Sequence, residues 1–318
     1  MNEVNVLITA ASRRVALVKS FMTALQNAGG QVITVDYDMH SPALFFSHKY
    51  YQVPLVDDLQ YLPKICEIIE KENINLIIPT IDPELMLWAK NKDNFEKRGI
   101  CISVSPPETI KTCLDKWETF RFFKAHQLPF PESYLPGMTT GDMTYPLFIK
   151  PRIGRGSVHA YQIRNKKELD FFLEYVPNPL VQDYLAGKEF TVDAFYSREH
   201  RLISLVSRYR LVIRSGVSDR GKTFMIPEMT ELITKIGQKL QFSGAINIQG
   251  KIVADNIIFF EINPRFSGGI QLSIAAGENF ADYIIREHKG ETLIPRLNEF
   301  NDHLIMASYE DSLFLDGR

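Results

Sequence analysis

The sequence lacks several features that would assign it to a class of protein at once. It has only three cysteines, Cys66, Cys101 and Cys113, with no C-x-x-C pair, so neither a disulfide framework nor a zinc site is expected. Its 36 Lys and Arg against 38 Asp and Glu give no positive field for nucleic acid. No apolar run approaches the roughly 20 residues of a membrane span, and Glu3 stands where a signal peptide would be basic. We therefore expect a cytoplasmic protein without nucleic-acid or membrane partners.

Well-known active-site motifs are missing as well. There is no G-x-x-x-x-G-K-[ST] loop, and the stretch TAASRRVAL at 9–17 has Ala and Ser where a G-x-G-x-x-G motif has glycines. A nicotinamide dinucleotide on the first domain, with Asp36 on its ribose, is therefore only a minor alternative. No Ser/His/Asp or Cys/His arrangement is evident, so the chemistry does not require a covalent protein intermediate.

The first hundred residues alternate between apolar strands and helices. The predicted strands are 4–10, 31–38, 74–82 and 100–105, and the predicted helices are 13–29 and 61–73. Apolar strands separated by helices indicate a parallel sheet covered on both faces. The sequence therefore predicts a small, doubly wound, Rossmann-like α/β domain.

The pattern changes after Pro106 and Pro107. Residues 107–127 read as one continuous helix, and from Tyr145 onward short strands with glycine turns predict antiparallel hairpins. A helix is expected at 227–242, followed by a two-stranded hairpin over 244–263. This second part of the chain is therefore expected to be α+β.

The stretch FFEINPRFSGG, residues 259–269, carries polar residues at alternate positions of a predicted strand. Because alternate side chains share a face, Glu261 and Asn263 should project together while Phe260 and Ile262 face the core. Their oxygens suit a hard cation such as Mg²⁺. Arg265 could reach a phosphate oxygen where the strand ends. Without further evidence, these residues could equally be polar residues of an edge strand facing water.

Three other stretches carry weaker signals. In KPRIGRGSVHA, residues 150–160, glycines would let backbone N–H groups approach a polyphosphate beside Lys150, although a tight hairpin explains them too. In LVQDYLAGKEFTVD, residues 180–193, an apolar strand and Glu189 could hold a base and a ribose. Gln249 lies one strand before Glu261, and Lys116 lies on a helix, where a lone lysine is usually solvated.

In this order and spacing, these stretches resemble the ATP-grasp superfamily, and most closely one half of the carbamoyl-phosphate synthase large chain. The resemblance implies a mixed α/β and α+β fold, a Rossmann-like pre-ATP-grasp domain followed by a two-lobed ATP-grasp fold. The implied divisions are 1–107 for the first domain, 108–185 for the small lobe and 186–318 for the catalytic lobe. It also implies ATP and Mg²⁺, or Mn²⁺ in its place, as cofactors.

The resemblance assigns roles residue by residue. It implies that Lys116 and Lys150 hold the ATP phosphates and that Gly154, Arg155, Gly156 and Ser157 form a flexible lid. The adenine would be bounded by Gln182, Asp183 and Leu185, and the ribose would be held by Glu189. Mg²⁺ would be ligated by Gln249, Glu261 and Asn263, with Arg265 on the transferring phosphate.

The implied activity is that of an ATP-dependent ligase that activates a carboxylate as an acyl phosphate for attack by an amine. Formation of carbamoyl phosphate is not expected, because the chain has one such unit and no glutaminase signature. The alternative is a nucleotide-binding regulatory or assembly subunit without turnover. A homodimer is left open as a partner.

The acceptor substrate is predicted from a cluster of cations. Arg208, Arg210, Arg214 and Arg220 lie beside a glycine, and we expect Arg214 to bind the acceptor carboxylate. At strand ends of the first domain, where open α/β sheets place their ligands, Ser12, Arg13, Asp82 and Glu84 are expected to face the same cleft.

Overall fold

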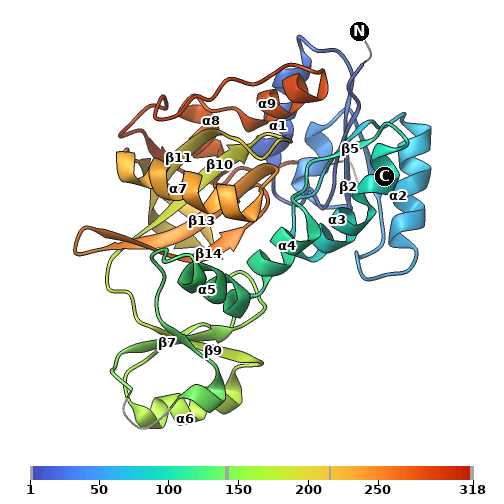
Figure 1. The fold of residues 1–318 in the computed structure, drawn as a ribbon. Helices are drawn as coiled ribbons and strands as arrows, with labels where there is room; N and C mark the ends of the chain where they lie inside the picture. The colour runs from blue at the N-terminus through green and yellow to red at the C-terminus, as the bar shows by residue number, and fades with distance from the viewer. Residues whose placement is uncertain (1–2, 140–142, 215, 316–318) are drawn as a thin grey trace.

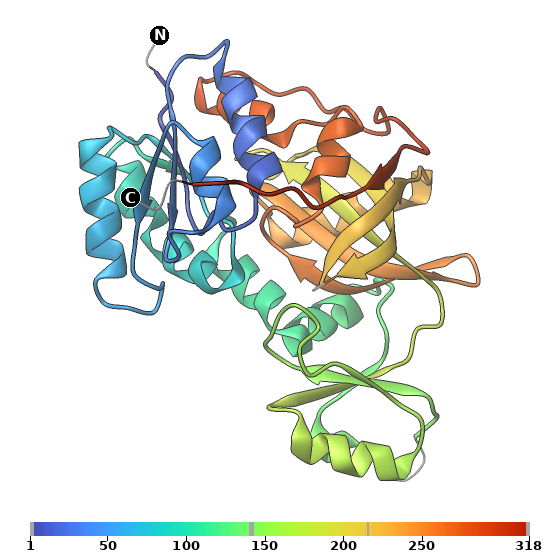
Figure 2. The same ribbon diagram turned by 180° about the vertical axis from the view of Figure 1, so that it is seen from behind.

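The structure is a computed structural model that describes residues 3–139, 143–214 and 216–315. These residues form three β-sheets, one after another along the chain. Figure 1 shows the first sheet and its helices beside the largest sheet, with the smallest sheet projecting from them beyond α5. Figure 2 shows the same arrangement from behind.

The first sheet is parallel, with the order β3-β2-β1-β4-β5. Its strands are β1 (Val6–Ile8), β2 (Val32–Asp36), β3 (Lys49–Gln52), β4 (Leu76–Ile78) and β5 (Cys101–Ile102). The helices around it are α1 (Val15–Leu25), η1 (Pro42–Phe46), α2 (Tyr61–Lys71) and α3 (Asp82–Glu96). Val6 and Ile8 pack with α1, whereas Leu7 packs with α2 and α3. Both faces of the sheet are therefore covered, which confirms the predicted Rossmann-like domain.

The helix predicted over 107–127 is two helices, α4 (Pro107–Leu114) and α5 (Lys116–Ala125). Asp115 between them is extended, at φ −103° and ψ 109°, and its side chain accepts hydrogen bonds from the backbone N–H groups of Trp117 and Glu118. An aspartate that caps a new helix competes with continuation of the old one. The prediction of one helix was therefore wrong, and Lys116 lies in the first turn of α5 instead of mid-helix.

The smallest sheet is antiparallel, with the order β6-β9-β7-β8. Its strands are β6 (Ser133–Tyr134), β7 (Leu147–Pro151), β8 (Tyr161–Ile163) and β9 (Pro179–Asp183). The turn η2 (Pro136–Met138) follows β6, and α6 (Lys166–Tyr175) covers one face of the sheet. Leu147, Ile149 and Leu169 belong to a core separate from the rest of the molecule.

The largest sheet is antiparallel, with the order β14-β13-β10-β11-β12-β15. Its strands are β10 (Lys188–Tyr196), β11 (Leu202–Arg214), β12 (Val217–Thr223), β13 (Gly244–Val253), β14 (Asn256–Asn263) and β15 (Ile305–Ala307). The helices are α7 (Pro227–Leu240), α8 (Ile270–Ala275) and α9 (Phe280–His288). The α+β prediction is confirmed, and the hairpin over 244–263 forms as β13 and β14.

Helix α1 joins the first sheet to the largest one. Leu17 and Phe21 of α1 share a buried cluster with Phe280 of α9 and Phe195 of β10. A continuous apolar core of this kind resists relative movement, whereas the small lobe has a core of its own. The divisions at 107/108 and 185/186 stay a prediction. Among the described residues, no helix combines the length and apolar character that crossing a membrane requires.

Candidate active site

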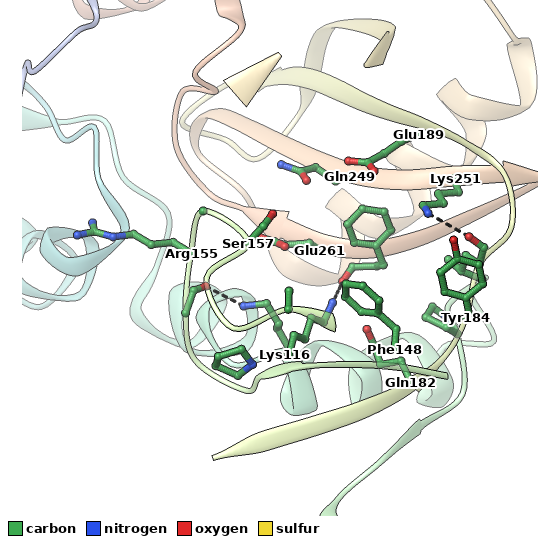
Figure 3. Close-up of a pocket in the computed structure, with 18 of the residues that line it drawn as sticks. Lys116, Phe148, Arg155, Ser157, Gln182, Tyr184, Glu189, Gln249, Lys251 and Glu261 are labelled. Carbon is green, nitrogen blue, oxygen red and sulfur yellow. Dashed lines mark hydrogen bonds between the residues drawn. The ribbon is translucent and has the colours of Figure 1, made fainter. Parts of the chain in front are cut away.

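A pocket lies between the small-lobe sheet and the largest sheet (Figure 3). In this view Glu189, Gln249 and Lys251 lie on one side and Lys116, Phe148 and Gln182 on the other. The predicted site residues that line the pocket are Lys116, Lys150, Gly154, Arg155, Gly156, Ser157, Gln182, Asp183, Leu185, Glu189, Gln249 and Glu261. Asn263, Arg265 and Arg214 are not part of its lining.

The floor of the pocket is one face of the largest sheet. Strand register places Glu261 of β14 directly opposite Gln249 of β13, and Lys251 of β13 opposite Glu189 of β10. Arg210 of β11 completes this face, because its Nη1 donates to Glu189 Oε1 at 2.7 Å and to Gln249 Oε1 at 2.9 Å. Four neighbouring strands therefore each bring at least one charged or amide side chain to the floor.

A β-bulge on β14 changes the predicted orientation of Phe260. Gln249 pairs with Glu261 while the next residue, Gly250, pairs with Phe259, so Phe260 is an extra residue on its strand. Phe260 consequently lines the pocket, and Phe259 is the residue buried in the core. The expectation that Phe260 faces the core was wrong, because strict alternation ends at a bulge; Ile262 is buried as expected.

The opposite wall comes from the small lobe and α5. Phe148 and Lys150 alternate on β7, and Gln182 of β9 pairs with Phe148. Gln182 is buried and donates from Nε2 to Ser133 Oγ at 2.8 Å. Lys116 Nζ donates to the Gly154 carbonyl oxygen at 2.8 Å, which ties the start of α5 to the lid.

Lys150 is buried beside Phe260. Its Nζ lies 3.4 Å from the Phe260 carbonyl oxygen and 5.3 Å from the centre of the Phe260 ring. Burial lowers the pKa of Lys150 to about 7, although the nearby Glu261 carboxylate opposes the shift. An ammonium with a lowered pKa in a pocket gains much from the arrival of an anion.

One end of the pocket offers an apolar slot with backbone groups, formed by the chain from Asp183 to Leu185. Lys251 closes it, because its Nζ donates to the Leu185 carbonyl oxygen at 3.0 Å and lies 5.3 Å from the centre of the Tyr184 ring. Lys251 and Tyr184 were missed by sequence reasoning. The signal for Lys251 was available, since it lies two residues from Gln249 on one strand.

Asn263 lies on the same face of the sheet as Glu261, as predicted, but it is buried and is not part of the pocket lining. Its Nδ2 donates to Asn247 Oδ1 at 3.3 Å, and its Oδ1 accepts from Arg265 Nη2 at 3.2 Å. Of the three predicted metal ligands, the pocket therefore brings together Glu261 and Gln249, and Asn263 orients Arg265.

Arg265 meets the first domain at a cluster that we call the arginine junction, formed by Arg14, Asp82 and Arg265. Arg265 Nη2 and Asp82 Oδ2 are 3.0 Å apart. Arg14 donates to the carbonyl oxygens of Thr80 at 2.7 Å and of Phe266 and Ser267 at 3.3 Å each.

Two atoms of the junction, Arg265 Nε and Asp82 Oδ1, are buried without a hydrogen-bond partner among the described residues. Burial, followed by the charge of Arg265, lowers the pKa of Arg14 to about 9. The junction is therefore a buried, cation-rich contact between the first domain and the EINPR segment.

Of the residues predicted for the acceptor, Arg210 lines the pocket and the others do not. Arg214 is 62% exposed and pairs with Asp219 and Glu310. Ser12 and Arg13 are exposed.

Glu84 is fully buried and does not face a cleft. It accepts hydrogen bonds from Thr80 N, Tyr61 Oη and Trp88 Nε1, so it stabilises the start of α3. Asp36, the ribose ligand of the dinucleotide alternative, already accepts from the backbone N–H groups of Ser12 and Asp38.

The donor set of the pocket suits Mg²⁺ only together with a nucleotide. No group of three His, Cys, Asp or Glu side chains is arranged for a metal within the described ranges. The Glu261 carboxylate lines the pocket and accepts no hydrogen bond from any described residue. One free carboxylate beside an amide oxygen fits a cation whose other ligands are phosphate oxygens and water.

Two family models match the chain. Residues 6–103 match the PylC-like N-terminal domain, and residues 175–311 match the ATP-grasp in the biosynthetic pathway with Ter operon. Between them the matches cover much of the first domain and of the largest sheet.

Two curated proteins are similar in sequence. The arginine-specific large chain of carbamoyl phosphate synthase from Bacillus subtilis is 23% identical over 267 residues, which cover 78% of this chain and 24% of that protein. The D-alanine–D-alanine ligase of Petrotoga mobilis is 25% identical over 260 residues, 72% of this chain and 87% of that protein. The chain thus spans about a quarter of the synthase large chain but most of the ligase.

A solved structure with a similar fold is the biotin carboxylase domain dimer of 2-oxoglutarate carboxylase from Hydrogenobacter thermophilus. That structure contains MgADP, ADP and bicarbonate. Its TM-score is 0.79 at 16% identity, and the match covers 96% of this chain and 74% of that one. The likeness extends over all three sheets, and at this identity it bears on the fold alone.

Proposed function

The chain is an ATP-grasp protein, and from that premise we propose that it is an ADP-forming ligase that joins a carboxylate to an amine. The similar D-alanine–D-alanine ligase, of which the match covers most of the length, supports a ligase over a carboxylase. Both proposed substrates are small molecules.

We propose that ATP lies in the pocket with its adenine between Phe148 and Leu185 and its phosphates toward Lys116 and Lys150. The apolar slot and the Leu185 backbone suit a base, and two lysines beside a glycine lid suit phosphates. Glu189, at the floor, is within reach of a ribose placed between these two ends.

The proposed reaction needs little covalent chemistry from the protein. The substrate carboxylate oxygen attacks the γ-phosphorus, and the bond from that phosphorus to the β,γ-bridging oxygen breaks, leaving ADP. The amine then attacks the acyl carbon, the bond from carbon to the phosphate oxygen breaks, and the amine proton passes to phosphate or solvent. Such steps are accelerated mainly by in-line positioning and by cations placed where charge develops.

We propose that Mg²⁺ is held by Glu261 and Gln249 when nucleotide is present. When bound there with the nucleotide, the ion would neutralise charge on the transferring phosphate. Gln249 must then share its amide oxygen between Arg210 and the ion, so Glu261 is the stronger of the two ligands.

The observation that supports the proposal most is that the free Glu261 carboxylate lines the same pocket as Lys116 and Lys150. The experiment is ADP release from Mg-ATP against pooled carboxylates plus pooled amines, with Glu261→Ala as control. ADP that requires a carboxylate and is absent from the variant supports the ligase, and splitting the pools identifies the substrates. ADP release that persists in Glu261→Ala would refute this assignment of the site.

The acceptor is proposed to approach Arg265 from the side of the first domain. The side chains of Arg265 and Asp82 pair with each other and are 15% and 16% exposed, and a partly exposed guanidinium suits an acceptor carboxylate. Arg214 stays a second candidate for the acceptor carboxylate, although its side chain is mostly exposed. An Arg214→Ala variant with an unchanged acceptor KM would rule it out.

A subunit that binds nucleotide without turnover is the second candidate. It is favoured by one observation, that Arg210 already occupies the Gln249 oxygen and Glu189. In that case Mg-ATP would raise the melting temperature, because ligand binding stabilises the folded state, while no carboxylate and amine would yield ADP.

We also propose a homodimer, as the similar carboxylase domain is a dimer. Light scattering coupled to gel filtration tests it, since a dimer has twice the mass of one chain. A mass equal to one chain at micromolar concentration would contradict it.

A further inference from the structure

The guanidinium of Arg210 is shared between the floor of the pocket and a hairpin beside the lid. On the floor, Nη1 donates to Glu189 Oε1 at 2.7 Å and to Gln249 Oε1 at 2.9 Å. On the other side, Nη2 donates to the Gly216 carbonyl oxygen at 2.6 Å, and Nε lies 3.3 Å from Ser218 Oγ. The side chain is 6% exposed, so all three nitrogens are held by protein groups in a buried position.

The lid packs directly against this hairpin. A Cβ built on Gly216 would lie 3.0 Å from Gly156 Cα and 3.4 Å from its carbonyl carbon. Gly216 has φ +76° and Gly156 has φ +66°, a region that other residues rarely adopt. The two backbones therefore meet without an intervening side chain, and a side chain on Gly216 would push them apart.

These contacts form a short physical chain from floor to lid. Glu189 and Gln249 hold one edge of the guanidinium, the other edge holds Gly216, and Gly216 supports Gly156. A guanidinium is planar and rigid, so its hydrogen bonds at both edges are geometrically coupled. A ligand that reorients Glu189 or Gln249 must change the support of the lid, and by linkage the reverse also holds.

We propose that Arg210 is a positioning residue that couples nucleotide binding on the floor of the pocket to closure of the lid through Gly216. This inference rests on the proposed function only in needing a nucleotide that binds the pocket. It assigns to Arg210 a role distinct from that of Lys116 and Lys150, which lie on the opposite wall.

The test uses trypsin, because Arg155 lies in the lid and is exposed. The rate of cleavage at the bond between Arg155 and Gly156, followed by mass spectrometry, reports whether the lid is closed. We expect Mg-ADP to slow this cleavage in the wild type. In Arg210→Lys, which keeps the charge but not the rigid fork, we expect the protection by saturating Mg-ADP to fall by about tenfold, within the usual range of coupling between sites.

A second variant keeps Arg210 and disrupts the next contact in the series, the one between Gly216 and Gly156. Gly216→Ala leaves the bonds to Glu189 and Gln249 but separates the hairpin from the lid, so we expect a similar loss of protection. In the double variant the losses should not add, since both act through one path. Losses that add, or full protection in either single variant, would overturn the coupling.

The control is Leu211→Ala, the neighbour of Arg210 on β11, which is 54% exposed. Mg-ADP should protect this variant from trypsin as well as it protects the wild type. A loss of protection as large as that of Arg210→Lys would assign the effect to the strand as a whole and overturn the role of Arg210. A wild type that binds no Mg-ADP would refute the proposed function itself. A wild type that binds it with equal protection in every variant would refute only the coupling. If Arg210→Lys fails to fold, Gly216→Ala alone decides.

Discussion

The pocket and the arginine junction both contain several charged side chains, but these side chains have different kinds of partners in the two places. In the pocket, Lys116 and Lys150 bond only to backbone carbonyl oxygens among the described residues, and Glu261 accepts no hydrogen bond from them. At the junction, Arg265 pairs with Asp82 and Arg14 donates to three carbonyl oxygens.

The difference separates the proposed nucleotide site from a contact that holds Arg265 in place where we propose that the acceptor approaches. Charged groups that a protein leaves unpaired in a pocket are costly unless a ligand completes them. Charged groups that pair across a domain boundary fix the relative position of its sides. We therefore expect changes in the pocket to abolish nucleotide chemistry, and changes at the junction to act on the acceptor.

The largest expected effect is that of Lys150→Met. We propose that this buried cation faces the transferring phosphate, so its loss should lower kcat by on the order of 10²–10³-fold, as does removal of a single transition-state donor elsewhere. The measurement is steady-state ADP release. Lys124→Met, at an exposed lysine paired with Glu132, should leave kcat unchanged, and a kcat for Lys150→Met within twofold of the wild type would contradict the role.

Next in size is Glu261→Gln, which removes the only carboxylate of the proposed metal set without changing its shape. We expect the Mg²⁺ concentration for half-maximal activity to rise at least about tenfold. Mutation of a residue that only hydrogen-bonds to a metal ligand already lowers metal affinity or activity by about 10–100-fold. A Mg²⁺ titration at saturating ATP measures it. An unchanged midpoint would contradict the proposal that Glu261 on β14 is a metal ligand.

Asp82→Asn tests the junction side of the comparison. It leaves Arg265 without its ionic partner. We therefore expect the KM for the acceptor carboxylate to change by about tenfold, which is less than the effect of truncating one partner of a fully buried charged pair. The Kd for Mg-ADP, measured by calorimetry, should stay within twofold. Equal changes in both constants would show that the junction and the pocket act as one site.

The smallest expected effect is on pH dependence. Burial lowers the pKa of Lys150 to about 7, so this side chain is mostly neutral above that pH. Phosphate oxygens favour its charged form, so binding takes up a proton. The affinity for ADP should therefore fall as pH rises, by about fivefold between pH 7 and 8. Calorimetry in buffers of different ionisation enthalpy would detect the proton, and Lys150→Met should lose the dependence.

The sequence was most informative where the chemistry is local. Alternation within one strand placed Glu261 in the pocket, and the order of four motifs predicted both the fold and the lysines. Pairing across strands was not available from the sequence. The bulge that turns Phe260 into the pocket depends on the register of β13 and β14, and Arg210 reaches Glu189 only through the register of β10 and β11.

Alternation predicted the face of Asn263 but not its partners. Asn263 pairs with Asn247 as Glu261 pairs with Gln249, so both side chains project from one face of the sheet, but the Asn263 side chain bonds to Asn247 and Arg265 and is not part of the pocket lining. Asp115 shows the same limit for helices, because a run of helical residues does not reveal that an internal aspartate caps a second helix.

The most direct measurement follows heavy oxygen from a labelled carboxylate substrate into the products. If the carboxylate is activated as an acyl phosphate, amine attack breaks the bond between carbon and the phosphate oxygen, and each inorganic phosphate carries one labelled oxygen. Unlabelled phosphate, or label found in AMP, would contradict the central claim that this pocket transfers the γ-phosphate of ATP to a carboxylate.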